Sequence, residues 1–100
     1  MIFYYSILFD ERGIQMSNES KILEMVLSGK QDANIKFSDL QKLLKMLGFS
    51  CRVKGDHFIY TKPNMIEIIN IQPNGNKAKP YQVKQIRNLL IKNLMEGKDV

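Results

Sequence analysis

The chain has 100 residues, of which 44% are hydrophobic and 25% are charged. This composition is typical of one folded domain with a modest core and excludes a disordered chain. The net charge of +5 at pH 7 favours polyanionic partners, namely nucleic acid, an anionic membrane surface or an acidic protein. Between residues 76 and 95 there is no acidic residue but there are five basic ones, Lys77, Lys79, Lys84, Arg87 and Lys92.

The first residues are unusual for a folded domain. Met1 to Phe9 is an apolar run that is too short to span a bilayer, and it lacks the basic start and the cleavage site of a signal peptide. A second methionine, Met16, precedes a helix start, and Glu11-Arg12-Gly13 can be encoded by a purine-rich stretch resembling a bacterial ribosome-binding site. We expect residues 1–15 to be a leader or flexible arm outside the functional protein. The alternative is an edge strand or a partner-binding arm.

Residues 16–36 are expected to form a short extra helix and a polar connection. Ser17 or Asn18 can cap this helix, and Ser28-Gly29 can end it. Four apolar residues occur at helical spacing, namely Ile22, Leu23, Val26 and Leu27.

The next helix has the clearest pattern in the chain. Ser38 followed by Gln41 three residues later is typical of a capping box, and Gly48 is a C-terminal stop. The i, i+3, i+4, i+7 stripe that should face the core consists of Leu40, Leu43, Leu44 and Leu47.

A three-stranded antiparallel sheet should follow. Gly55-Asp56 is a two-residue hairpin signal between Phe49–Lys54 and His57–Thr61, so Lys54 and His57 should face each other. After a turn at residues 62–64, the isoleucine-rich segment Ile66–Gln72 predicts the third strand. Because side chains alternate along a strand, one face should carry Phe49, Cys51, Val53, Phe58 and Tyr60, and the other should carry Arg52, Lys54, His57 and Ile59.

Residues 73–80 form a loop by composition, and Pro80 suits the first position of a last helix. Its core-facing residues should be Val83, Ile86, Leu90 and Leu94, with Gln82, Lys84, Gln85, Arg87 and Lys92 mostly outward. Both strong helices need one apolar sheet face, so they should share it and leave the other face open. The predicted class is α+β, an α-β-β-β-α arrangement that resembles double-stranded RNA-binding domains.

Cysteine and tyrosine residues offer few further sites. One cysteine, Cys51, cannot form an internal disulfide, and with a single histidine in the chain a metal site has little support. We interpret Cys51 as a small buried residue on the inner sheet face, which fits a reducing cytoplasm, and we expect no cofactor and no membrane partner. Tyr60 is more plausible as a core residue than as a base-stacking one, and Tyr81 is undecided.

Four segments together resemble HicA-type toxins, small RNA-cleaving proteins of bacterial toxin–antitoxin pairs. The segments are residues 43–49 (LLKMLGF), 54–57 (KGDH), 70–73 (NIQP) and 77–87 (KAKPYQVKQIR). The similarity covers Phe37 to Leu94 and implies that residues 37–96 form an RNA-cleaving domain, an mRNA interferase. The resemblance also implies a HicB-type antitoxin that covers the active face.

The family's functional histidine follows a Gly-Ser pair, and the matching residue here is His57. Two departures from the family pattern occur: Asp56 replaces the serine, and Phe58 replaces a frequent second histidine. Asp56 could hydrogen-bond within the turn, or it could favour a protonated His57.

Metal-independent RNA cleavage needs a base for the ribose 2′-OH and positive groups beside the crowded phosphorus. Histidine suits the first task because its reference pKa is about 6.5. We expect His57 to be the base, with Lys54 and Arg52 stabilising the phosphate charge. We expect the basic loop and the last helix to bind the RNA, through Lys77, Lys79, Lys84 and Arg87.

Two other interpretations compete with an endoribonuclease toxin. A non-catalytic RNA-binding module would use the same basic sheet face, and a protein-interaction domain would use its charge only for an acidic antitoxin. For His57 itself, the alternative is a residue at the hairpin end that merely hydrogen-bonds a neighbour.

Overall fold

The computed structural model describes residues 18–97. The predicted leader, residues 1–15, and the possible cap Ser17 lie outside the described residues. The elements in chain order are the helix α2 (Asn18–Ser28), the 3₁₀ turn η1 (Asp32–Asn34), the helix α3 (Phe37–Met46), the strands β1 (Ser50–Lys54), β2 (His57–Thr61), β3 (Ile69–Ile71), β4 (Pro73–Asn74) and β5 (Lys77–Ala78), and the helix α4 (Pro80–Met95). Within residues 18–97, every helix is too short or too polar to cross a membrane.

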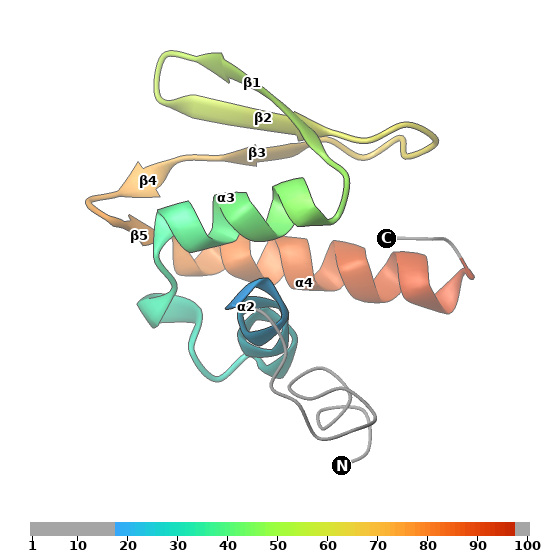
Figure 1. Ribbon diagram of the computed structural model, residues 1–100, viewed down its shortest axis with the longest axis horizontal. Helices are drawn as coiled ribbons and strands as arrows, with labels where there is room; N and C mark the ends of the chain where they lie inside the picture. The colour runs from blue at the N-terminus through green and yellow to red at the C-terminus, as the bar shows by residue number, and fades with distance from the viewer. Residues whose placement is uncertain (1–17, 98–100) are drawn as a thin grey trace.

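The helices and the sheet form layers (Figure 1). The antiparallel sheet β1-β2-β3 lies on one side of α3 and α4, and α2 packs against these two helices on the side away from the sheet. The core between the layers includes Leu40, Leu43 and Leu44 of α3, Val83, Ile86 and Leu90 of α4, and Tyr60, Ile69 and Ile71 of the sheet. The predicted α+β class, with two helices on one sheet face, is confirmed, and the extra helix α2 contributes the fully buried Val26.

Helix α3 begins one residue before the predicted capping box. Its N-cap is Lys36, which makes no side-chain cap bond. The backbone N–H of Phe37 instead donates to the carbonyl of Asn76 at 2.9 Å. The capping-box prediction was therefore wrong, because a neighbouring loop already satisfies an N–H group at this helix end.

The predicted end of α3 at Gly48 is confirmed. Gly48 has a φ of 95°, its N–H donates to the carbonyl of Lys45, and the N–H of Phe49 donates to the carbonyl of Leu44, both at 3.0 Å. This pair of bonds is the Schellman ending, which needs a left-handed residue at this position. It turns the chain directly from α3 into β1.

The hairpin β1–β2 has the register that its turn predicts. Lys54 pairs with His57 and Val53 pairs with Phe58. Gly55 has a φ of 64°, whereas the φ of Asp56 is not positive. A glycine with positive φ at the first turn position only is the pattern of a type II′ turn.

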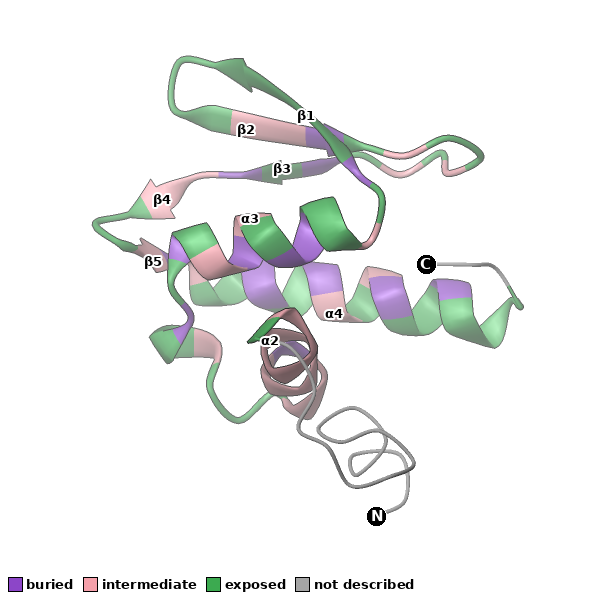
Figure 2. Ribbon diagram, viewed as in Figure 1, coloured by how far each residue is buried: buried purple, intermediate pink, exposed green. Residues whose placement is uncertain are grey.

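The inner face of β1 is not part of the core, contrary to the prediction. All five residues of β1 are exposed, as Figure 2 shows, and Cys51 is exposed as well. Strand β1 is one of the two edge strands of the sheet, and it lies across a hollow of about 660 Å³ lined in part by Cys51, Val53 and Phe58. The interpretation of Cys51 as a buried residue was therefore wrong.

The third strand is shorter than the predicted Ile66–Gln72. Only residues 69–71 pair with β2, and Ile66 and Ile68 are 94% and 64% exposed. The predicted loop at residues 73–80 contains the small hairpin β4–β5. The N–H of Ala78 donates to the carbonyl of Ile35 at 2.8 Å, so the connection before α3 holds this hairpin in place.

Helix α4 buries a more polar stripe than predicted. Val83, Ile86 and Leu90 are buried as expected, but Gln82 and Asn93 are buried too, and Leu94 is 52% exposed. The inward stripe thus ends at Asn93 rather than at Leu94. The side-chain amide of Asn93 donates to the carbonyl of Leu89 at 2.8 Å, within the helix itself.

Candidate active site

The open face of the sheet carries two rows of side chains, in which every residue except Ile59 is polar. One row contains Lys54 and His57, which are cross-strand partners. The antiparallel register between β2 and β3, in which Phe58 pairs with Ile71, continues this row to Gln72. The neighbouring row consists of Arg52, Ile59 and Asn70. Directly opposite residues have Cβ atoms about 4.5–5.5 Å apart, so the register alone brings two cations, one imidazole and two amides together.

His57 is held outward at the start of β2. Its side chain is 47% exposed, and its Nδ1 lies 3.1 Å from Oδ1 of Asn70. Its Nε2 lies 3.4 Å from Nε2 of Gln72 and 3.7 Å from Oδ1 of Asp56. Both ring nitrogens therefore have polar neighbours, and the ring remains accessible to a ligand from solvent.

Gln72 connects the histidine to the basic loop. Its side-chain nitrogen donates to Oδ2 of Asp56 at 3.2 Å, and its side-chain oxygen accepts from Nζ of Lys79 at 3.3 Å. Asp56, which stands where the resembled family has a serine, is thus hydrogen-bonded to the residue that follows β3.

Gln82 of α4 fixes the free edge of β3. Its Oε1 accepts from the backbone N–H of Gln72 at 3.0 Å, and its Nε2 donates to the backbone carbonyl of Asn70 at 3.4 Å. One buried amide thereby replaces a missing strand partner on both sides of Ile71. The segment carrying Asn70 and Gln72 is tied to the helix layer, although both side chains face the open side of the sheet.

Arg52 and Lys54 lie on β1, where both are exposed. Their positions leave both side chains accessible to a phosphate on the open face, beside His57.

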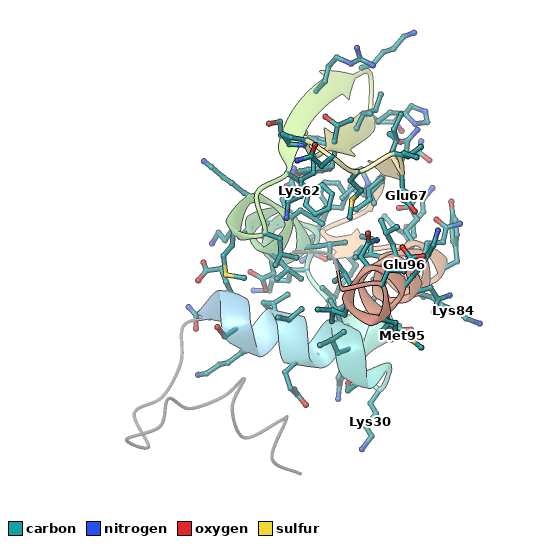
Figure 3. All side chains as sticks on the ribbon, turned by 90° about the vertical axis from the view of Figure 1, so that its right-hand side faces the viewer. Lys30, Lys62, Glu67, Lys84, Met95 and Glu96 are labelled. Carbon is teal, nitrogen blue, oxygen red and sulfur yellow. The ribbon has the colours of Figure 1, made fainter. Side chains whose placement is uncertain are left out.

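The four residues predicted to bind RNA lie in different surroundings. Lys84 is exposed and projects outward from α4 (Figure 3). Lys77 and Lys79 are half-buried near the start of α4, where Lys79 contacts Gln72. Arg87 points inward instead: its Nη1 donates to both oxygens of Asp32, at 2.9 and 3.1 Å, and to the carbonyl of Val26 at 3.1 Å. This engagement argues against an RNA contact by Arg87.

We expect Arg87→Ala to lower the free energy of unfolding by about 1–3 kcal/mol, because it leaves a largely buried carboxylate without its charged donor. The side chains of Arg87 and Asp32 are only 14% and 21% exposed. Lys84→Ala, on the exposed side of the same helix, is the matched control and should change stability by less than about 0.5 kcal/mol. Urea unfolding measures both. Weakened RNA binding with unchanged stability in Arg87→Ala would contradict this assignment.

The hollow beneath β1 lies on the other face of the sheet from His57. Its lining includes Lys42, Lys45 and the buried Tyr60.

Burial raises the pKa of the Tyr60 hydroxyl to about 12, an effect that the Gln41 side chain partly opposes. Tyr60 is therefore a core residue, as predicted, and is unsuited to proton transfer near neutral pH. Tyr81 is 56% exposed, and its hydroxyl accepts from Nε2 of Gln82 at 3.4 Å.

Sequence reasoning missed roles for Asn70, Gln72 and Gln82. The alternation of polar Asn70 and Gln72 around apolar Ile71 was a usable signal, because it places both amides on the same face as His57. No local pattern distinguishes Gln82 from an ordinary outward residue of α4, since its partners belong to the edge of another element.

Comparison with known protein families gives a match over the domain that carries the site. The family described as "HicA toxin of bacterial toxin-antitoxin" matches residues 37–94, which is more than half of the chain and includes α3, the whole sheet and most of α4. No curated protein and no solved structure matches the sequence. The chain therefore belongs to the HicA toxin family of bacterial toxin–antitoxin systems.

Proposed function

We propose that this protein is an endoribonuclease that cleaves messenger RNA in the bacterial cytoplasm without a metal ion, with His57 as the catalytic base. One observation carries the proposal: the chain's only histidine stands outward on the open sheet face, opposite Lys54 and hydrogen-bonded to Asn70. Membership of the HicA family supports the choice of RNA as substrate.

In the proposed reaction, His57 takes the proton of a ribose 2′-OH while that oxygen attacks the adjacent phosphorus. The bond between the 2′-oxygen and phosphorus forms, and the bond between phosphorus and the 5′-oxygen breaks. The products are a 2′,3′-cyclic phosphate and a 5′-hydroxyl. A base within hydrogen-bond reach contributes about 10²- to 10⁴-fold to such a step.

Cationic side chains would stabilise the negative charge that develops on the phosphate oxygens. Lys54 is the nearest candidate because it is the cross-strand partner of His57, and Arg52 lies two residues earlier on the same face. Lys77 and Lys84 would contribute longer-range attraction to the RNA backbone.

The leaving 5′-oxygen needs a proton, and a chain with one histidine has no second imidazole to supply it. The proton must come from water, from a lysine, or from His57 after it has collected the 2′-OH proton. We therefore expect slow turnover.

The same face is where a partner antitoxin would inhibit the enzyme. A HicB-like antitoxin with an acidic surface would complement Arg52 and Lys54 and block access to His57.

The test is incubation of the purified protein with messenger RNA in excess EDTA. We expect cleavage at an undiminished rate, since no step uses a metal ion. Loss of cleavage in EDTA, restored by a divalent cation, would contradict the proposal.

Two other outcomes would each favour a rival function. Intact RNA that is nevertheless bound in a salt-sensitive way would identify a non-catalytic RNA-binding module on the same basic face. No RNA binding at any ionic strength, together with tight association with an acidic partner, would identify a protein-interaction domain.

A further inference from the structure

The contacts around Gln72 form a chain of hydrogen bonds with one possible direction. The chain runs from Lys79 to Gln72, from Gln72 to His57, and from His57 to Asn70. A lysine ammonium has three donors and no acceptor. The Gln72 atom that faces Lys79 must therefore be the amide oxygen, which places the NH₂ group on the side of Asp56 and His57.

The orientation of Gln72 determines which nitrogen of His57 carries the proton. The NH₂ group of Gln72 has donors only, so Nε2 of the neutral ring, 3.4 Å away, must be the acceptor. The proton of the neutral ring then lies on Nδ1, 3.1 Å from the side-chain oxygen of Asn70. Asn70 accepts that bond, so both neighbours favour the same tautomer.

Asp56 does not oppose this arrangement in the neutral ring. Its Oδ2 accepts from Gln72 at 3.2 Å, whereas its Oδ1 is 3.7 Å from Nε2, beyond hydrogen-bond distance. The carboxylate thus adds a second reason for Gln72 to direct its NH₂ group toward the turn.

The support for this chain reaches into the core. Gln82 is 5% exposed and bonds the backbone of both Asn70 and Gln72. The two residues that contact the imidazole are therefore held at fixed positions on β3 and just after it.

We propose that Lys79, Gln72 and Asn70 are positioning residues that hold neutral His57 in the Nδ1–H tautomer and keep Nε2 unprotonated, so that it can accept a proton. The catalytic consequence rests on the function proposed above. The contact between Gln72 and Nε2 is long at 3.4 Å, so a ribose hydroxyl can displace it at little cost. Lys79 thereby acts through Gln72 instead of contacting RNA.

The experiment is ¹⁵N NMR of the imidazole ring, without RNA, at about pH 8, where an ordinary histidine is neutral. The chain has one histidine, so its two ring nitrogens give the only imidazole signals. We expect a protonated Nδ1 and an unprotonated Nε2, the reverse of the preference of histidine free in water. A protonated Nε2 in the unmodified protein would overturn the proposal.

Two variants test the direction of the chain. Gln72→Glu replaces the donor by an acceptor of the same shape, so Nε2 should gain a proton. Lys79→Met frees Gln72 to turn over and should lower the Nδ1–H fraction. Lys77→Met, two residues away on β5, is the control and should leave the ring signals unchanged. Ring signals that are the same in all three variants would also overturn the proposal.

The readout separates this inference from the nuclease function. A ring in the Nδ1–H form, in a protein that does not cleave RNA, would sustain the tautomer assignment and remove only its catalytic consequence. If cleavage occurs, its rate in Gln72→Glu and Lys79→Met should fall in proportion to the lost fraction of unprotonated Nε2. Full cleavage rates with a displaced tautomer would show that the chain has no positioning role.

Discussion

His57→Ala is expected to slow RNA cleavage by about 10²- to 10⁴-fold, the usual contribution of a positioned general base. The ring is the only imidazole in the chain, so no other histidine can take its place. RNA binding should persist, because Arg52 and Lys54 keep their exposed positions on β1. Cleavage assays and filter binding with the same RNA measure the two effects.

The matched control for His57→Ala is Thr61→Ala. Thr61 lies on the same strand and the same face, four residues away, and is exposed. The Thr61→Ala variant should cleave RNA at the same rate as the unmodified protein. Expression without an antitoxin should arrest bacterial growth for the unmodified protein and the control but not for His57→Ala. Cleavage by His57→Ala within about threefold of the unmodified protein would remove His57 from the mechanism.

Leu44→Ala is expected to lower the free energy of unfolding by about 2–5 kcal/mol, through lost apolar burial and the cavity left behind. Leu44 is 0% exposed in the core shared by the helices and the sheet. Small domains have a total stability of about 5–15 kcal/mol, so this single change removes a large fraction of it. The chain has no tryptophan, and urea unfolding followed by far-ultraviolet circular dichroism is therefore the suitable measurement.

Met46→Ala, on the same helix, is the control for Leu44→Ala. Met46 is 47% exposed, and alanine is at least as good a helix former, so stability should change by less than about 0.5 kcal/mol. Equal losses in the two variants would show that α3 is not buried along the side that carries Leu44.

Local pattern was sufficient where neighbouring residues determine the structure. The leucine stripe and Gly48 predict α3 and its end, and Gly55 predicts the register that pairs Lys54 with His57. The sheet face of His57 follows from that register alone, because a strand has a period of two.

The same patterns failed where the outcome depends on which elements meet. The alternation of side chains along β1 places Cys51 and Val53 on the inner face correctly, but it does not show that this part of β1 lies over a hollow. Arg87 has the spacing of an outward residue, yet Asp32, distant in sequence, binds it against α2 and η1. Gln82 is buried because the edge of β3 needs a partner, and the periodicity of α4 alone gives no sign of that edge.

The central claim is that His57 activates a ribose 2′-hydroxyl, and the chemistry of the cut ends tests it most directly. Mass spectrometry of the products from a short RNA, and from the same RNA with a 2′-deoxy sugar at the cleaved position, is the decisive measurement. The mechanism predicts a 2′,3′-cyclic phosphate and a 5′-hydroxyl from the first substrate and no cleavage of the second. A 3′-hydroxyl and a 5′-phosphate, with the deoxy substrate cut equally well, would contradict it.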